Sequence, residues 1–373
     1  MKKVIVIGAG IVGLAHALAA AKKGYKVEVF ERSEKAVGAS IRNFGMVWPV
    51  GQPVGKTYDR ALRSREVWLK IAQESKMFID PVGSVHVAYQ QDELAVLQEF
   101  FEQQKDDAYK LEWVEPANAD SYSQAINPEG FLGGVFSETE CIVDPRQAIA
   151  TIPSYLEDKF NVVFNWNTAV TEVNENAVRT KSGWYKGDHI FVCSGADFEI
   201  LFPETFTQMP ITKCKLQMMR TGIQPNSWRL GAALAGGLTL THYKAFESCS
   251  SLEALKNRIK AQTPLFPELG IHVMVSQNGV GELVIGDSHE YGLNPSPFDR
   301  EDINAAILNY LKGFLKAPDL NIKEQWHGVY AKMQNGASEY VNKIDENVTI
   351  VNGLGGAGMT LSFGLAEETT NFL

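Results

Sequence analysis

The chain has 373 residues, a net charge of -9 and 45% hydrophobic residues. This length favours two domains, or one large domain with an insertion, and the apolar fraction excludes a disordered chain. The acidic balance argues against a nucleic-acid partner, and the lack of a long apolar run argues against a membrane span.

The cysteines and histidines follow no familiar ligand spacing. The four cysteines are scattered, and none of the seven histidines forms a His-x-x-x-His pattern. These features predict free thiols in a reducing, cytoplasmic compartment and no metal site.

The first thirty-one residues predict a βαβ unit that binds a dinucleotide. A β-branched run, Val4–Ile7, leads into Gly8-x-Gly10-x-x-Gly13, and an alanine-rich helical stretch follows. Gly8 permits a tight turn, Gly10 lets backbone approach a pyrophosphate, and Gly13 lets helix and strand pack closely. The helix N-terminus offers unpaired N–H groups to the diphosphate. A second strand ends at Glu31, which is placed to bind ribose hydroxyls.

Two other interpretations of this stretch explain less. A secretory signal is disfavoured because the glycines interrupt the apolar run. A buried strand and helix with small residues for packing would not explain the acid at the end of the second strand. The loop over 32–48, dense in Gly, Ser and Asn, is then expected to wrap the cofactor further, although an ordinary surface loop is the alternative.

The middle of the chain predicts alternating helices and short strands. Helices are expected over 57–76, 91–105, 145–159, 252–261 and 299–314. Asp144 and Pro145 are suited to begin the third helix, and Pro153 predicts a kink or an early end within it. Strands are expected over 84–89, 131–141, 162–166, 169–174, 177–180, 189–193, 215–220, 238–243, 272–276 and 282–285.

Two glycine-rich corners follow later strands. The strand over 189–193 enters Ser194-Gly195-Ala196, which is either another edge facing the cofactor or a plain corner. The strand over 347–352 enters a second Gly-x-Gly-x-x-Gly at Gly353–Gly358, but too few residues follow to build another βαβ unit. We therefore expect this corner to aim one helix N-terminus at the cofactor already bound. A flavin would benefit, because its reduced ring gains negative charge at N1 and the C2 oxygen.

The two ends of the chain resemble the FAD-dependent D-amino-acid-oxidase superfamily, which includes glycine oxidase and sarcosine oxidase types. The resemblance rests on Gly8–Gly13, Glu31-Arg32, residues 38–45 and Gly353–Thr360. Within the superfamily, Gly355–Thr360, Leu216–Met218 and Trp326–Tyr330 resemble a subgroup associated with the breakdown of aminophosphonates such as 2-aminoethylphosphonate.

The resemblance implies an α/β fold with a Rossmann-like FAD-binding domain and a substrate domain built on a mainly antiparallel sheet. Residues 1–82, 142–212 and 325–373 would form the first domain, and 83–141 and 213–324 the second. FAD is expected to be non-covalent, because no cysteine follows Cys249. The implied cofactor-binding residues are Gly8, Gly10, Ile11, Val12, Gly13, Glu31, Arg32, Ser40, Arg42, Asn43, Gly45, Met46, Val170, Ser194, Gly195, Gly355, Gly356, Gly358, Met359 and Thr360.

The implied reaction is hydride transfer from a small amine to flavin N5, followed by hydrolysis of the imine. Only one dinucleotide fold is evident, so the electrons are expected to come from the substrate and to pass to oxygen or an electron carrier. An amino acid or 2-hydroxy acid oxidase or dehydrogenase, and a non-catalytic flavin-binding subunit, are the alternatives.

Candidate substrate residues are polar side chains of the second domain and the segment entering the last strand. For each of them a structural role is the simpler interpretation, since a lone histidine in a strand usually satisfies local hydrogen bonds. Lys332 and His242 stand out, because a phosphonate dianion requires cationic partners. Amino-acid-specific relatives often place an arginine near position 332, so its absence argues against an α-amino acid. The candidates are Gln217, His242, Tyr243, His289, Tyr330 and Lys332.

Overall fold

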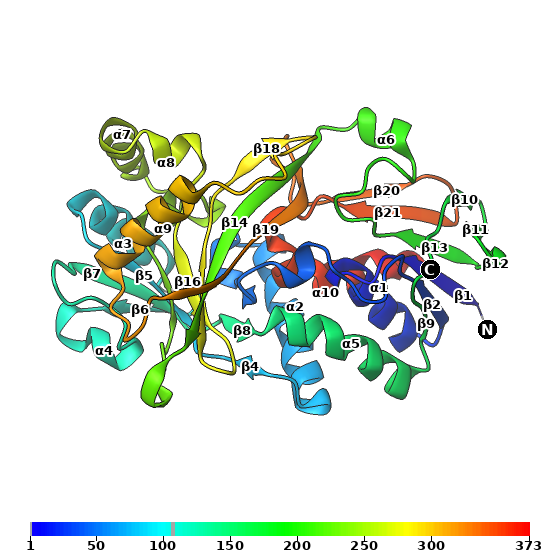
Figure 1. Ribbon diagram of the computed structural model, residues 1–373, viewed down its shortest axis with the longest axis horizontal. Helices are drawn as coiled ribbons and strands as arrows, with labels where there is room; N and C mark the ends of the chain where they lie inside the picture. The colour runs from blue at the N-terminus through cyan, green and yellow to red at the C-terminus, as the bar shows by residue number, and fades with distance from the viewer. Residues whose placement is uncertain (1, 106–108) are drawn as a thin grey trace.

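A computed structural model describes residues 2–105 and 109–373, which build two large β-sheets (Figure 1). The first sheet has six strands in the order β20-β21-β13-β1-β2-β9. Its neighbouring strands are parallel except for the edge strand β20. Its strands are β1 (Lys3–Ile7), β2 (Lys26–Phe30), β9 (Val163–Asn165), β13 (His189–Val192), β20 (Tyr340–Lys343) and β21 (Val348–Asn352).

Four helices flank this parallel sheet and bury its apolar strands. They are α1 (Ile11–Lys22), α2 (Lys56–Ser75), α5 (Pro145–Phe160) and α10 (Gly358–Thr369). Helix α1 lies against α10, where Nε2 of His16 is 2.8 Å from the hydroxyl of Thr369. Helix α2 contacts α10 through Trp68, whose ring N–H donates to the carbonyl of Met359. The two ends of the chain are therefore packed together beside one sheet.

Helix α5 begins as the sequence predicts but does not end early. The Asp144 carboxylate accepts the backbone N–H groups of Arg146 and Gln147 at 2.9 and 3.2 Å. The helix continues through Pro153 to Phe160, so of the two predicted effects of Pro153 the early end is excluded, and the predicted extent to about residue 159 is confirmed. Buried Ile149 and Ile152 pack the helix into the core, and this packing outweighs the hydrogen bond that proline cannot make.

The second sheet has nine strands and is antiparallel except for the pair β5 and β15. Its order is β18-β14-β17-β16-β15-β5-β7-β6, with β19 paired to β14. Four helices lie at the end of the molecule that holds this sheet, on the left in Figure 1. They are α3 (Gln91–Gln104), α7 (Leu252–Gln262), α8 (Leu265–Glu268) and α9 (Glu301–Phe314). The strands are β5 (Ser84–Ala88), β6 (Leu111–Val114), β7 (Gly133–Ser137), β14 (Ile211–Ile223), β15 (Ala233–Ala235), β16 (Met274–Gln277), β17 (Glu282–Gly286), β18 (Glu290–Gly292) and β19 (Ile322–Met333).

This combination of a parallel sheet with a mainly antiparallel one confirms the predicted α/β fold class. Two small sheets, β10-β11-β12 and β3-β8-β4, complete it. None of the helices among the described residues has the length and apolar character needed to cross a membrane. The remaining elements are β3 (Met46–Val47), β4 (Ile79–Asp80), β8 (Cys141–Val143), β10 (Glu172–Asn174), β11 (Ala177–Thr180), β12 (Gly183–Lys186), α4 (Ala119–Tyr122) and α6 (Pro203–Thr207).

One predicted strand, over 238–243, is a 3-10 helix instead, η5 (Gly237–Thr241). Both the backbone N–H and the hydroxyl of Thr239 donate to the carbonyl of Gly236, at 2.9 and 2.6 Å. Such local bonds to a threonine side chain compete with strand pairing. The correction matters for function, because His242 then lies at the end of a helical turn and not within a strand.

Candidate active site

The two glycine corners lie side by side. The first follows β1 and the second follows β21, and both strands belong to the parallel sheet, so their carboxyl ends reach the same edge. A Cβ placed on Gly358 would lie 3.6 Å from Cγ2 of Ile11. The prediction that the end of the chain returns to the opening corner is confirmed.

Two of the three opening glycines are required by the backbone itself. Gly8 has φ +98°, and a Cβ there would lie 2.4 Å from the carbonyl oxygen of Cys193. A Cβ on Gly13 would lie 1.9 Å from the carbonyl oxygen of Gly8. A Cβ on Gly10 would meet only the Ser40 hydroxyl, at 3.1 Å. The space in front of Gly10 is therefore left open on the side where a pyrophosphate would approach.

Short polar side chains surround this opening corner. The Ser40 hydroxyl accepts the N–H of Ile11 at 2.9 Å, at the start of α1. The Glu31 carboxylate accepts the N–H groups of Ala9 and Ser33 at 3.0 and 3.1 Å. These bonds hold Glu31 beside the glycine turn, as expected of an acid that faces a ribose.

The loop after Glu31 is tied down by its own side chains. The Asn43 amide donates to the carbonyls of Ala39 and Ser40 and accepts the N–H of Gly45 at 2.8 Å. Arg42 donates to the His327 carbonyl at 3.2 Å, which joins the loop to β19. The exposed Arg32 pairs with Asp197 at 2.6 Å. This part of the loop is thus shaped around the cavity and is not a free surface loop.

One cavity of about 800 Å³ is bordered by both glycine corners. Its volume is in the range of small-molecule and cofactor sites. The corner at Ser194 and Gly195, which the sequence left open, also lines it, as does Val170. Gly13 and Gly45 do not, and a Cβ on Gly45 would lie 2.0 Å from the Val143 carbonyl, so these two serve packing. The lining includes the other predicted cofactor residues: Gly8, Gly10, Ile11, Val12, Glu31, Arg32, Ser40, Arg42, Asn43, Met46, Gly355, Gly356, Gly358, Met359 and Thr360.

These residues fit FAD. The open space before Gly10, the N-terminus of α1 and the carboxylate of Glu31 suit a diphosphate and a ribose, and the second corner borders the same cavity. Backbone at Gly355 and Gly356 can come close to a ring edge without a side chain in between.

Strand β19 brings two predicted substrate residues to the second corner. A Cβ on Gly356 would lie 3.6 Å from the Tyr330 hydroxyl, and one on Gly355 would lie 3.6 Å from Cγ of Lys332. The Lys332 ammonium donates to the Tyr291 hydroxyl at 2.9 Å. Burial lowers the pKa of Lys332 below its usual 10.5, and the like charge of Lys244 acts in the same direction.

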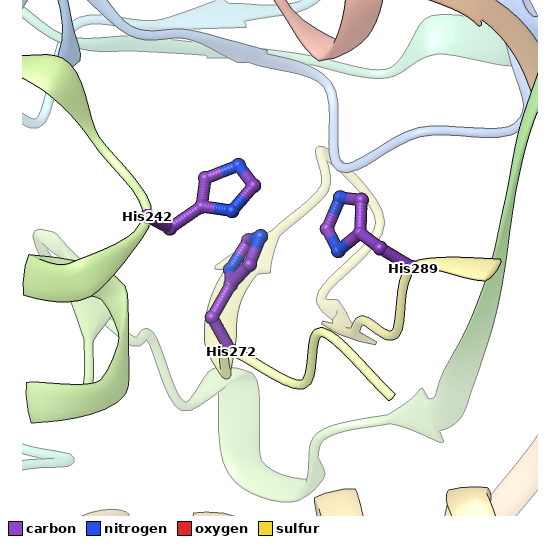
Figure 2. A group of neighbouring side chains, drawn as sticks. All are labelled: His242, His272 and His289. Atoms are coloured by element: carbon purple, nitrogen blue, oxygen red, sulfur yellow. The ribbon is translucent and has the colours of Figure 1, made fainter. Parts of the chain in front are cut away.

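Three histidines that line the cavity lie close together (Figure 2), and Asp287 lines the same cavity. We call His242, His272, His289 and Asp287 the imidazole cluster. The ring of His242 is centred 3.9 Å from that of His272 and 4.8 Å from that of His289. Burial lowers the pKa of His289 to about 4 and that of His272 well below 6.5, so both rings are neutral near pH 7. The pKa of His242 is also lowered by desolvation, although its side chain is exposed to the cavity.

Gln217 is the predicted substrate residue that lies elsewhere. Its amide donates to the Arg300 carbonyl and to the Asn304 side chain, both at 2.8 Å, so it ties β14 to α9. The reason is strand alternation, since Leu216 and Met218 face the cavity and the residue between them faces away. Tyr243, in contrast, lines the cavity beside His242.

Sequence reasoning missed His272 and Asp287. His272 lies just before β16 and Asp287 just after β17, and neither has a spacing to another candidate that a motif would reveal. The alternating apolar pattern of the neighbouring strands predicts that His272 and Asp287 lie near a sheet, but it does not predict that they meet His242 and His289.

The comparisons with known proteins agree with this geometry. Residues 3–372 match the family model described as DAO, FAD dependent oxidoreductase. A curated relative, 4-oxocyclohex-2-ene-1-carboxylate 5-dehydrogenase of Sinomonas cyclohexanicum, is 25% identical over 196 residues, which is 49% of this chain and 32% of that protein. The chain thus spans about a third of that relative's length.

Solved structures share the fold over the whole chain. Glycine oxidase of Bacillus cereus has a TM-score of 0.78 at 14% identity and covers 100% of this chain and 94% of its own. The L-α-glycerophosphate oxidase of Mycoplasma pneumoniae, solved with FAD bound, has a TM-score of 0.75 at 17% identity, with 100% and 95% covered. On the match of the family model to nearly its full length, the chain belongs to the DAO family of FAD-dependent oxidoreductases, and FAD is its cofactor.

Proposed function

We propose that the protein oxidises a small amine that carries a phosphonate group, such as 2-aminoethylphosphonate or an N-alkyl derivative. The observation that carries the proposal is Lys332, a half-buried cation beside the second glycine corner. In this proposal, residues 1–82, 142–212 and 325–373 bind FAD, and 83–141 and 213–324 form the roof over the substrate.

Lys332 is suited to bind an anion because its charge is poorly compensated. Among the described residues it forms no ion pair with a carboxylate, and its ammonium contacts the hydroxyl and the ring of Tyr291. Lys244 adds a second ammonium to the lining of the same cavity. An anion between them would relieve both the burial of Lys332 and the repulsion of the two cations. A dianionic phosphonate gains more from this arrangement than a carboxylate does.

The chain's own groups would then orient the amine and exclude water. When bound, FAD supplies the hydride acceptor, its N5 atom. Tyr330 and Tyr243 present rings to the cavity that would shield the reacting carbon from solvent. Helix α10 begins at Gly358, which lines the cavity, and its N-terminal amide groups favour negative charge on a molecule bound there. The imine leaves to be hydrolysed to a carbonyl, and oxygen or an electron carrier takes up the electrons.

Anaerobic flavin reduction tests this function directly. The purified holoenzyme is mixed with 2-aminoethylphosphonate, its N-methyl derivative, glycine, sarcosine and lactate, and the loss of flavin absorbance is followed by stopped flow. We expect bleaching by the aminophosphonates at the lowest concentrations. Bleaching by glycine or sarcosine alone would refute the phosphonate preference, and no bleaching by any donor would favour a non-catalytic flavin protein.

A matched pair of variants tests the role of Lys332. The Lys332→Ala variant is expected to raise the KM for an aminophosphonate at least about tenfold, which corresponds to about 1.4 kcal/mol, with FAD content unchanged. The control is Lys159→Ala, which removes a lysine that pairs with Glu74 and does not line the cavity. Equal kinetics in wild type and Lys332→Ala would remove Lys332 from the site.

A second candidate is oxidation of a 2-hydroxy acid. It is favoured by His242, a neutral imidazole at the cavity that can accept a hydroxyl proton. Bleaching by lactate in the panel above, together with its loss in His242→Gln, would support this candidate over the first.

A further inference from the structure

The imidazole cluster has the composition of a metal site although its members are far apart in the sequence. The ring nitrogens of His242, His272 and His289 all lie within 4.8 Å of one another. Figure 2 shows the three rings reaching one point from separate segments, namely the end of η5, the start of β16 and the start of β18. No other part of the described chain gathers such ligand groups.

The cluster holds polar atoms that the protein leaves unsatisfied. His272 is buried, and neither of its ring nitrogens has a hydrogen-bond partner among the described residues. The same holds for Oδ1 of buried Asp287, which is 3.2 Å from Nε2 of His272 without bonding geometry. A buried polar group without a hydrogen-bond partner destabilises the folded protein. Several together at one point indicate a ligand that satisfies them.

One ring is already oriented for ligation. Nδ1 of His289 lies 2.8 Å from the Gly270 carbonyl oxygen, and because a carbonyl only accepts, that nitrogen carries the hydrogen. Nε2 therefore presents its lone pair toward the cluster. A backbone carbonyl that fixes the tautomer in this way is the usual outer partner of a metal-bound histidine.

The donor set favours a cation over an anion. Three imidazoles offer nitrogen lone pairs, and Asp287 adds carboxyl oxygens, which are further ligands of metal ions. Ligands about 2.1 Å from one tetrahedral ion lie about 3.4 Å apart, so the rings would close on the ion by small side-chain rotations. We propose that the imidazole cluster binds one divalent transition-metal ion, of which Zn²⁺ suits the donors best.

The position of the cluster suggests what the ion does. All four residues line the FAD cavity, so a three-histidine site would keep an open coordination position facing it. If the protein oxidises aminophosphonates, one phosphonate oxygen takes the open position and another pairs with Lys332, whose ammonium contacts Tyr291, two residues beyond His289. This second step rests on the proposed function, whereas metal binding itself does not.

Metal binding is tested on the holoenzyme with the metal alone. Protein stripped with a chelator is dialysed against Zn²⁺, and bound metal is counted by elemental analysis; Co²⁺ then reports tetrahedral coordination through its visible bands. We expect one ion per chain, and at least about 100-fold weaker binding in His242→Gln and His272→Gln. The matched control is His327→Gln, a partly exposed histidine outside the cluster that pairs with Asp299.

His242→Gln keeps the test valid if His272→Gln fails to fold, because it faces the cavity, and FAD content and thermal midpoint report folding. No stoichiometric metal in the wild type, or equal metal in wild type and His242→Gln, overturns the site. Anchoring is tested by methylphosphonate, whose affinity is followed by the flavin spectrum. We expect at least about tenfold tighter binding with Zn²⁺, and equal affinity refutes the anchoring step.

These results separate the two proposals. Zinc uptake without flavin bleaching by aminophosphonates would leave the metal site standing and end the proposed function. Flavin bleaching by aminophosphonates without metal uptake would support the proposed function and rule out the metal site.

Discussion

The two glycines Gly10 and Gly13 lie three residues apart in one motif, yet the structure predicts opposite consequences of changing each to alanine. A Cβ on Gly13 would lie 1.9 Å from the Gly8 carbonyl oxygen and 3.3 Å from Val6 Cγ1. A Cβ on Gly10 would meet nothing closer than the Ser40 hydroxyl at 3.1 Å, and Gly10 has an extended φ of -69° that any residue adopts.

Gly13→Ala is expected to destabilise the protein whether or not FAD is bound. To reach an ordinary contact of about 3.4 Å, helix α1 must move about 1.5 Å away from β1, because the opposing atom is backbone. Overpacking that flexible side chains can absorb costs about 1–3 kcal/mol. Here the opposing atom cannot rotate away, so we expect a loss of about 3 kcal/mol or more.

Gly10→Ala is expected to act on the cofactor and spare the fold. The Ser40 side chain can shift by a few tenths of an ångström, so the stability of FAD-free protein should change by less than about 1 kcal/mol. The added methyl group occupies the space where the pyrophosphate would contact backbone. A loss of about 100-fold in FAD affinity, or about 2.7 kcal/mol, is the expected result.

Two measurements decide the matter. Urea unfolding of FAD-free protein gives stability, and quenching of flavin fluorescence gives the dissociation constant of FAD. The reasoning is refuted if Gly13→Ala leaves the FAD-free protein as stable as the wild type, or if Gly10→Ala destabilises it as strongly as Gly13→Ala does.

Four further predictions concern the charge of Lys332, the protonation of His16, the pair of Arg60 with Glu368 and the attachment of FAD. Because burial lowers the pKa of Lys332 below 10.5, the side chain loses its charge as the pH rises through that lowered pKa, and the affinity for methylphosphonate should fall. Lys332→Ala should lose this pH dependence. The same pH profile in wild type and Lys332→Ala would contradict a role of Lys332 in binding the anion. Burial lowers the pKa of His16 from 6.5 to about 4, so as the pH falls the unfolded chain takes up the proton before the folded chain does. The free energy of unfolding should therefore fall as pH drops from 6.5 toward 4, and His16→Gln should reduce this slope by up to about 1.4 kcal/mol per pH unit in urea titrations. An identical slope in wild type and variant would contradict the assignment to His16. Buried Arg60 donates to both oxygens of Glu368 at 3.1 and 2.7 Å and so joins α2 to α10. Arg60→Ala should lower the free energy of unfolding by about 3 kcal/mol, whereas Arg63→Ala, which removes a more exposed partner of Glu368, should lower it by less than about 1 kcal/mol. Equal losses in the two variants would refute this distinction. FAD should be released on acid denaturation, since no cysteine follows Cys249; flavin colour that stays with the precipitated polypeptide would show a covalent link.

The FAD end of the protein was predictable because its signals are local. Strand, glycine turn and helix follow one another within the first 31 residues, and the order of these elements with the glycine spacing is a local signal. The return of the last corner was predictable for a different reason. A glycine turn after a buried-type strand resembles the second flavin contact of the family, and the structure brings Gly358 beside Ile11.

The substrate end was predictable only in part. Lys332 and Tyr330 lie beside the second corner, as their place before the last strand predicts, and their role in substrate binding stays a prediction. Gln217 was misplaced, because its side of β14 depends on strand alternation relative to α9 and on hydrogen bonds to Arg300 and Asn304. The stretch over 238–243 reads as a strand by its alternation, yet local bonds of Thr239 make it helical.

The sequence by itself determined the cofactor, the family and the parallel sheet at the two ends of the chain, since contiguous residues carry those properties. Only the tertiary structure decided that His242, His272 and His289, which are 30 and 17 positions apart, share one point with Asp287. The physical reason is that the antiparallel pairing of β16, β17 and their neighbours is set by long-range contacts, and no local pattern records which loops those contacts bring together.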